Sequence, residues 1–290
     1  MERVAHGAYI WPAPQTTPTQ RHQATVTALL RSRPQLVASH TSAAVVYGLP
    51  VLRSDLDRLH LTHRSRTSRP RRRDAYTVHR PPGPEVLPTT VEVKAGERRP
   101  SGHPSESDMF TEVAGLDVVV PALAVLGTAL VAGVPSGIAA ADSALRLELT
   151  TKEELERWLT RMRHTPGLGA ARHVVAQASP TAESPGESLA RLVLLELGYE
   201  VIPQFRIVDE GGWLVARVDF LLPELGVVVE FDGRIKYEGH DGAAALAAEK
   251  HREDRVRALG YGMARLVWAD LFRPARVRAA VEQAARAATR

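Results

Sequence analysis

The apolar residues between positions 187 and 267 change their spacing in a fixed order, and this order limits the folds that the chain can adopt. A helical pattern over 187–197 ends at Gly198, three strand-like stretches follow, and a second helical pattern ends at Gly260 before a final strand. The predicted strands are residues 201–208, 213–222, 227–231 and 263–267, and the second helix is 243–259. The order is α-β-β-β-α-β, an antiparallel meander followed by a helical crossover to one more strand. We therefore expect a mixed α/β (α+β) fold in this part of the chain.

The length of 290 residues favours two domains, and composition divides the chain further. Residues 1–100 form a basic α+β region, 101–178 a mostly helical region, 179–186 a linker rich in Ser and Pro, and 187–290 the domain described above. The first hundred residues carry fifteen Arg and one Lys against seven acidic residues. A net charge of +9 there predicts a polyanionic partner, whereas 176–270 carries ten bases and sixteen acids.

Several classes of protein and site are excluded or disfavoured by residues that are missing. The chain has no cysteine, which removes disulfides, thiolate metal sites and cysteine nucleophiles and fits a reducing compartment. Its first residues do not read as a secretory signal. Residues 118–141 lack charge, but Gly133 and Pro135 interrupt them, so we expect a buried helix, a turn and a second helix. The expectation is a cytoplasmic protein without a membrane span.

Six arginines lie within ten residues in the basic region, and they are candidates for binding nucleic acid. They are Arg64, Arg66, Arg69, Arg71, Arg72 and Arg73. Such a run cannot pack in a core, so it is either an ordinary solvated loop or an arm that contacts DNA. Lys250, one of only four lysines, is a further candidate, although it can also pair with Asp254 four residues on along a helix.

Three acidic residues gather on the predicted central hairpin. If Glu224 and Leu225 form its turn, Asp219 faces Glu230 across the two strands, and Asp232 falls on the same face two residues later. Carboxylates crowded on a buried hairpin repel one another unless a cation lies between them, and oxygen ligands suit Mg²⁺ or Mn²⁺. The alternative is a slipped register in which Asp219 points to solvent.

Residues of about 184–270 resemble the small restriction-endonuclease-like domains related to very-short-patch-repair endonucleases, within the PD-(D/E)xK nuclease superfamily. The matching segments are 184–188, 216–220, 229–237, 249–254 and 259–261, which read SPGES, ARVDF, VEFDGRIKY, EKHRED and LGY. The α-β-β-β-α-β order is also the core of that superfamily. The resemblance implies a DNA endonuclease that hydrolyses phosphodiester bonds with Mg²⁺ or Mn²⁺.

The superfamily's functional residues carry over position by position. Asp219 corresponds to the metal-binding aspartate, Glu230 to the acidic residue of the (D/E)xK element, and the carbonyl of Phe231 to a further metal ligand. The position of the motif lysine holds Asp232, so either Lys236 supplies the positive charge, or Asp232 is another ligand, or the site binds metal and DNA without cutting. Glu187 has two compatible interpretations. It can complete the capping box of the helix that begins after Ser184. The resemblance also gives the glutamate at this position a role in binding a metal-bound water.

The part of the chain before this nuclease-like segment resembles AbiEi-type antitoxin-like proteins of bacterial abortive-infection systems. The resemblance rests on residues 7–10, 42–44 and 47–50, which read GAYI, SAA and YGLP. The resemblance implies a winged helix that binds DNA, and the given sequence would then begin within the wing of that domain. It also implies a cognate toxin or another protein as partner. The main alternative to an endonuclease is a non-catalytic DNA-binding regulator or antitoxin that keeps a degenerate nuclease fold. A protein–protein adaptor is a third possibility because the C-terminal part is acidic.

Overall fold

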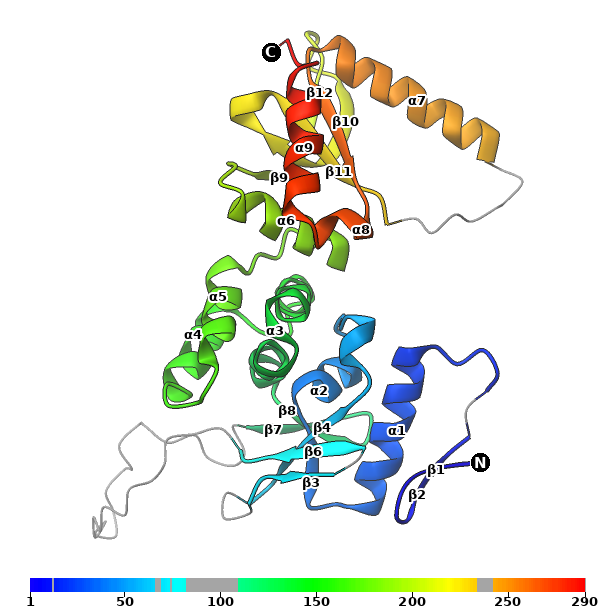
Figure 1. Ribbon diagram of the computed structural model, residues 1–290, viewed down its shortest axis with the longest axis vertical. Coiled ribbons are helices and arrows are strands. Elements are labelled where there is room, and N and C mark those ends of the chain that lie inside the picture. The colour runs from blue at the N-terminus through cyan, green and yellow to red at the C-terminus, as the bar shows by residue number, and fades with distance from the viewer. Residues whose placement is uncertain (12, 66–68, 74, 82–108, 234–241, 290) are drawn as a thin grey trace. The chain divides into compact units, whose positions relative to one another are not determined.

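The computed structural model describes residues 1–11, 13–65, 69–73, 75–81, 109–233 and 242–289, with side chains of 242–249 left out. The chain divides into two compact units, Met1–Ala178 and Ser179–Arg290, which we describe separately (Figure 1). The second unit begins at the segment that we predicted as a linker.

The first unit is built on a mixed sheet. Within the described residues, six strands form it in the order β5-β6-β4-β3-β8-β7. Their bounds are β3 (Leu36–Ala38), β4 (Leu59–His63), β5 (Arg71–Arg72), β6 (Tyr76–His79), β7 (Phe110–Val113) and β8 (Leu116–Val119). A separate hairpin joins β1 (Glu2–Ala5) and β2 (Ala8–Ile10). The helices are α1 (Pro18–Ser32), α2 (His40–Val46), α3 (Pro121–Arg146), α4 (Lys152–Arg161) and α5 (Leu168–Gln177), with a short 3-10 turn at Arg53–Asp55.

The start of the predicted helical region is extended instead. We expected residues 101–178 to be mostly helical. Helices α3 to α5 agree with this, but β7 and β8 form a hairpin before them, and Ala38 of β3 pairs with Val118 of β8. The prediction of helix at this point was wrong because the apolar residues of β8 run directly into the apolar helix α3. The shared sheet means that residues from the predicted 1–100 and 101–178 regions lie in one unit.

Helix α3 confirms the expectation of two apolar helices separated by a turn. Its length and composition would allow it to cross a membrane, yet 67% of its most apolar window is buried inside the unit. Gly133 has non-helical dihedral angles (φ 74°, ψ −171°), and Pro135 begins the second part of the helix. A left-handed φ of this kind is favourable only for glycine. The break turns one long apolar run into two core helices.

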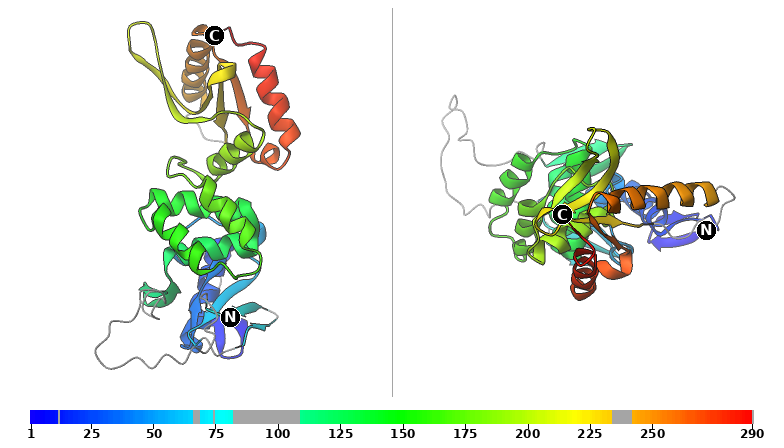
Figure 2. Two further views of the ribbon diagram at one scale, coloured as in Figure 1. Left: turned by 90° about the vertical axis from the view of Figure 1, so that its left-hand side faces the viewer. Right: turned by 90° about the horizontal axis from the view of Figure 1, so that it is seen from above.

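The second unit has the element order that the apolar pattern predicts. Its elements are α6 (Pro185–Glu196), β9 (Ile202–Val208), β10 (Leu214–Leu222), β11 (Val227–Phe231), α7 (Gly242–Ala258) and β12 (Gly262–Leu266), followed by α8 (Trp268–Leu271) and α9 (Pro274–Ala285). The sheet order is β12-β11-β10-β9, in which the described strands β11 and β12 are parallel and the other neighbours are antiparallel. Helices α7 and α9 cover opposite faces of this sheet (Figure 2).

A close contact fixes the start of α6 at the end of β11. A Cβ atom added to Gly186 would lie 1.9 Å from Cε1 of the Phe231 ring. That ring also packs edge-on against Trp268 of α8, with centroids 5.3 Å apart. Only a residue without a side chain allows the helix to approach so closely, and the approach brings the first turn of α6 to the carboxyl end of β11.

Replacing Gly186 by Ala is expected to destabilise the second unit by about 1–3 kcal/mol, because the added methyl group overlaps a ring that Trp268 holds in place. Urea unfolding followed by circular dichroism measures the change. Gly169→Ala in α5 is the matched control, since nothing lies within 4 Å of the added atom there. Equal stabilities of the Gly186 variant and the parent would contradict the close packing.

Candidate functional site

A row of polar residues crosses the sheet of the second unit. Strands β10 and β11 pair Leu221 with Val228, which is the register that the sequence predicted. Asp219 and Glu230 each lie one residue beyond the last pair, Phe220 with Val229, and Asp219 Oδ2 accepts the N–H of Phe231 there. Gln204 lies between Pro203 and Phe205, which pair with the two neighbours of Asp219. Glu230 pairs with Arg265 of β12. We call Gln204, Asp219, Glu230 and Arg265, one residue from each strand, the polar strip.

Asp219 is the most perturbed carboxyl group of the row. Burial is the main cause that raises its pKa to about 6, and the nearby carboxylates Glu187, Glu230 and Glu183 raise it further. A hydrogen bond of 2.8 Å from the backbone N–H of Phe231 to Oδ2 opposes these effects. No basic side chain among the described residues forms an ion pair with Asp219. Its charge is therefore compensated only in part.

Glu187 reaches the row from the first turn of α6. Ser184 caps this helix by accepting a hydrogen bond from the Glu187 N–H, which is one half of the predicted capping box. The Glu187 carboxylate, however, accepts hydrogen bonds from the Glu183 N–H at 2.9 Å and from the Gln204 side-chain amide at 3.1 Å. Glu187 is only 8% exposed, and Gln204 has a left-handed φ of 52°. A strained backbone thus supports the amide that orients a buried carboxylate.

Glu230 has basic partners that the sequence did not reveal. Arg252 of α7 binds both of its oxygens, at 2.9 and 3.1 Å, and Arg265 lies 3.7 Å from Oε2. Arg265 also binds Glu253. Asp232 follows at the end of β11, is half-buried and donates its backbone N–H to the carbonyl of Leu266. The strip is therefore acidic at Asp219 and Glu230, and its basic groups, Arg252 and Arg265, lie at Glu230.

The donor set fits a divalent cation in charge and in atom type. Asp219 offers a carboxylate whose neighbours repel its charge, and hard oxygen donors suit Mg²⁺ or Mn²⁺. Within the described part of the chain, no three His, Asp or Glu side chains converge closely enough to hold a metal ion as they stand. A cation at Asp219 would relieve the repulsion there, whereas Glu230 could contribute only by releasing an oxygen from Arg252.

The structure describes one of the two predicted lysines. Lys236 lies outside the described residues, and Lys250 is exposed on α7. The functional residues that the sequence analysis missed are Gln204, Arg252 and Arg265. The strand register was the available signal for these two strand residues, because Arg265 pairs with Glu230 and the neighbours of Gln204 pair with the neighbours of Asp219. Nothing local identifies Arg252, which meets Glu230 only after the chain folds.

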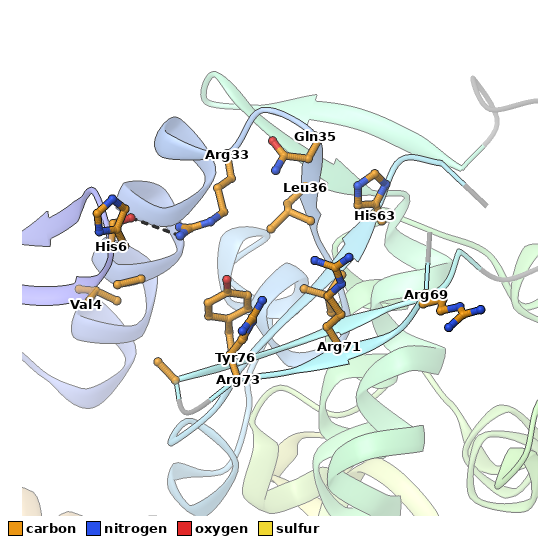
Figure 3. Close-up of a pocket in the computed structure, with 13 residues that line it drawn as sticks. Val4, His6, Arg33, Gln35, Leu36, His63, Arg69, Arg71, Arg73 and Tyr76 are labelled. Atoms are coloured by element: carbon orange, nitrogen blue, oxygen red, sulfur yellow. Dashed lines mark hydrogen bonds between the residues drawn. The ribbon is translucent and has the colours of Figure 1, made fainter. Parts of the chain in front are cut away.

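The predicted arginines of the first unit separate into two groups. Arg69, Arg71 and Arg73 line a cavity of about 550 Å³ together with Arg33 and His63 (Figure 3). None of the described residues lining it is acidic. Such a concentration of guanidinium groups favours an anion.

The other predicted arginines take no part in this cavity. Arg64 binds Asp117 at 2.5 Å and lies 5.9 Å from the centre of the Phe110 ring. Arg72 is exposed, and Arg66 lies outside the described residues. Arg64 is therefore paired within the first unit, whereas Arg33, Arg69, Arg71 and Arg73 line one cavity, and Arg33 also donates to the carbonyl of His6.

Comparisons with known proteins give relatives without a described activity. No family model matches the chain, and no solved structure matches it. Two uncharacterized proteins of Mycobacterium tuberculosis, from strains CDC 1551 and H37Rv, are each 32% identical to it over 149 residues. The similarity covers 51% of this chain and 54% of each relative. The chain thus spans about half the length of the curated relatives it matches.

The raised pKa of Asp219 predicts a pH-dependent cost to stability. The folded-state pKa of about 6 exceeds the ordinary value of 3.8, so Asp219 favours folding below pH 4 and loses that contribution as the pH rises through 6. In EDTA at pH 8, Asp219→Asn is expected to be more stable than the parent because it removes a partly buried charge. We expect a difference of about 1–2 kcal/mol, since solvent screens part of the full pKa shift. At pH 4 the two proteins should be nearly equal in stability.

Urea unfolding at the two pH values measures this difference. Glu224→Gln, in the exposed turn between β10 and β11, removes one carboxylate outside the row and serves as the control. The same stability difference for Asp219→Asn at both pH values would show that neighbouring charge and burial do not act on Asp219 in this way.

Proposed function

We propose that the protein is a metal-dependent DNA endonuclease whose site is the polar strip of the second unit. The observation that carries the proposal is the partly buried Asp219, whose pKa is raised by burial and by the carboxylates Glu187 and Glu230. Selection for stability alone would remove such crowding, and perturbed carboxyl groups mark functional sites. The resemblance to PD-(D/E)xK nucleases and the α-β-β-β-α-β order support the same conclusion.

In this proposal Asp219, Asp232 and the carbonyl of Phe231 would hold Mg²⁺ or Mn²⁺, together with Glu230 once Arg252 releases one of its oxygens. The ion would lower the pKa of a bound water and neutralise charge on the scissile phosphate. Gln204 and the Glu183 N–H orient Glu187, which faces the row as a proton acceptor. Arg252 and Arg265 place positive charge beside Glu230, where it can balance a phosphate. Lys236 is assigned the orientation of the attacking water through the resemblance alone.

The arginine-lined cavity of the first unit has a supporting role in this proposal. DNA presents a row of phosphates, and Arg33, Arg69, Arg71 and Arg73 supply guanidinium groups around one space. Contacts of this kind fix position on the duplex and carry no sequence information. They would raise the affinity of a chain whose C-terminal part is acidic.

A second candidate is a non-catalytic DNA-binding regulator or antitoxin with a degenerate site. The specific observation in its favour is that Arg252 binds both oxygens of Glu230, which already neutralises that carboxylate. Asp232 also stands where the related nucleases have a lysine. In this case the first unit would bind DNA and the second would not hydrolyse it.

Plasmid nicking separates the two candidates. The full chain with Mg²⁺ or Mn²⁺ is expected to nick supercoiled plasmid, and Asp219→Asn is expected to lose at least about 100-fold in rate because a metal-binding carboxylate is removed. Glu224→Gln should cut like the parent. DNA that is bound but left intact by the parent, with or without metal, would favour the regulator.

Salt dependence of DNA binding tests the arginine cavity. Each phosphate contact adds about 0.9 to the slope of log affinity against log salt concentration, so Arg71→Gln with Arg73→Gln should make the slope shallower by about 2. Arg64→Gln is the matched control because Asp117 already binds that side chain. Equal slopes for all three proteins, measured by fluorescence anisotropy, would place the DNA contacts elsewhere.

A further inference from the structure

A second cavity in the first unit, of about 870 Å³, has a different chemistry from the arginine-lined cavity. It lies among the start of α2, strands β4 and β6, helix α3 and the loop between α4 and α5. Its size is that of sites for small molecules, which range over about 300–1,000 Å³. Most of its wall is apolar and comes from Val119, Leu123, Leu130, Val131, Met162 and Pro166.

Histidine side chains form one end of this cavity. His40 and His79 line it, and their rings stack with centroids 3.8 Å apart. Nδ1 of His60 lies 2.9 Å from Nε2 of His79, so the three imidazoles form one cluster. His40 has a left-handed φ of 52°, which costs free energy in any residue other than glycine.

The surroundings keep this cluster in place. A Cβ atom at Gly127 of α3 would lie 2.9 Å from the His40 ring, so glycine is needed where the helix passes the cluster. Burial lowers the pKa of all three histidines, to about 3 for His60 and about 4 for His79. The imidazoles are therefore neutral at physiological pH and offer both donors and acceptors of hydrogen bonds.

Thr62 is a further polar residue beside the cavity. It lines the cavity from β4, and its residue is only 1% exposed. Its hydroxyl oxygen is buried without a hydrogen-bond partner among the described residues, so it lies beneath the cavity wall and does not face the open space. An unsatisfied buried hydroxyl costs free energy, which adds to the cost of the left-handed His40 nearby.

Charge at the rim determines the class of ligand. Arg163 and His164 are exposed at the mouth, on the loop between α4 and α5, and Arg163 donates to the His164 ring at 3.1 Å. None of the described residues that line the cavity is acidic. We propose that this cavity binds a small organic anion, with an apolar body against α3 and a carboxylate or phosphate at Arg163.

A matched pair of aromatic probes tests this site on the full chain. Titration calorimetry is expected to show saturable binding of one 2-naphthoate per chain and at least about tenfold weaker binding of the neutral 2-naphthylmethanol, since only the former carries the charge that Arg163 contacts. Arg163→Gln should weaken naphthoate binding about fivefold, and Arg157→Gln, an exposed change on α4 away from the cavity, should not.

A charge reversal gives a second test that does not disturb the core. Val131 is 37% exposed at the cavity, so Val131→Glu should fold normally and weaken naphthoate binding through charge repulsion. The control is Leu147→Glu. Leu147 is 47% exposed at the end of α3, and its replacement should leave naphthoate binding unchanged. No saturable binding, equal binding of the two probes, or naphthoate binding that neither cavity variant changes would each overturn the proposal. The nicking assay remains independent, because none of these residues belongs to the polar strip.

Discussion

The short turn between β10 and β11 fixes the strand register on which the polar strip of the second unit depends. Gly226 closes this turn with a left-handed φ of 59°, and its N–H donates to the carbonyl of Pro223. Side chains alternate along a strand, so a slip by one residue would send Asp219 and Glu230 to different faces. The β9–β10 and β11–β12 pairings then place Gln204 and Arg265 beside them. One local turn therefore fixes how the two central acidic residues are placed.

The sequence predicted those parts of the molecule that depend on neighbouring residues. The cap at Ser184, the β10–β11 register and the broken apolar helix α3 all follow from residue spacing or local backbone preference. The hairpin β7–β8 was missed because its apolar residues continue into α3 without a polar interruption. Arg252 was missed for another reason, since its partner Glu230 lies 22 positions earlier and no local pattern links them.

The two units both keep polar groups at a cost to stability. In the second unit, Asp219 is held near other carboxylates. In the first unit, His40 has a left-handed backbone and a neutral, partly buried imidazole. Each arrangement has a local support, namely the Phe231 N–H for Asp219 and the absent side chain of Gly127 for His40. Costs of this kind gather where a protein binds or transforms another molecule. The supports explain how the fold tolerates them.

The kink at Gly133 also sets how far each apolar segment reaches. On either side of it, α3 has 12 or 13 residues, and a helix of that length extends about 18–20 Å. Each half is shorter than the hydrocarbon layer of a bilayer, which is about 30 Å thick, and is of ordinary length for a helix in a domain core. One glycine thereby divides a strongly apolar run into two rods that can pack at different angles.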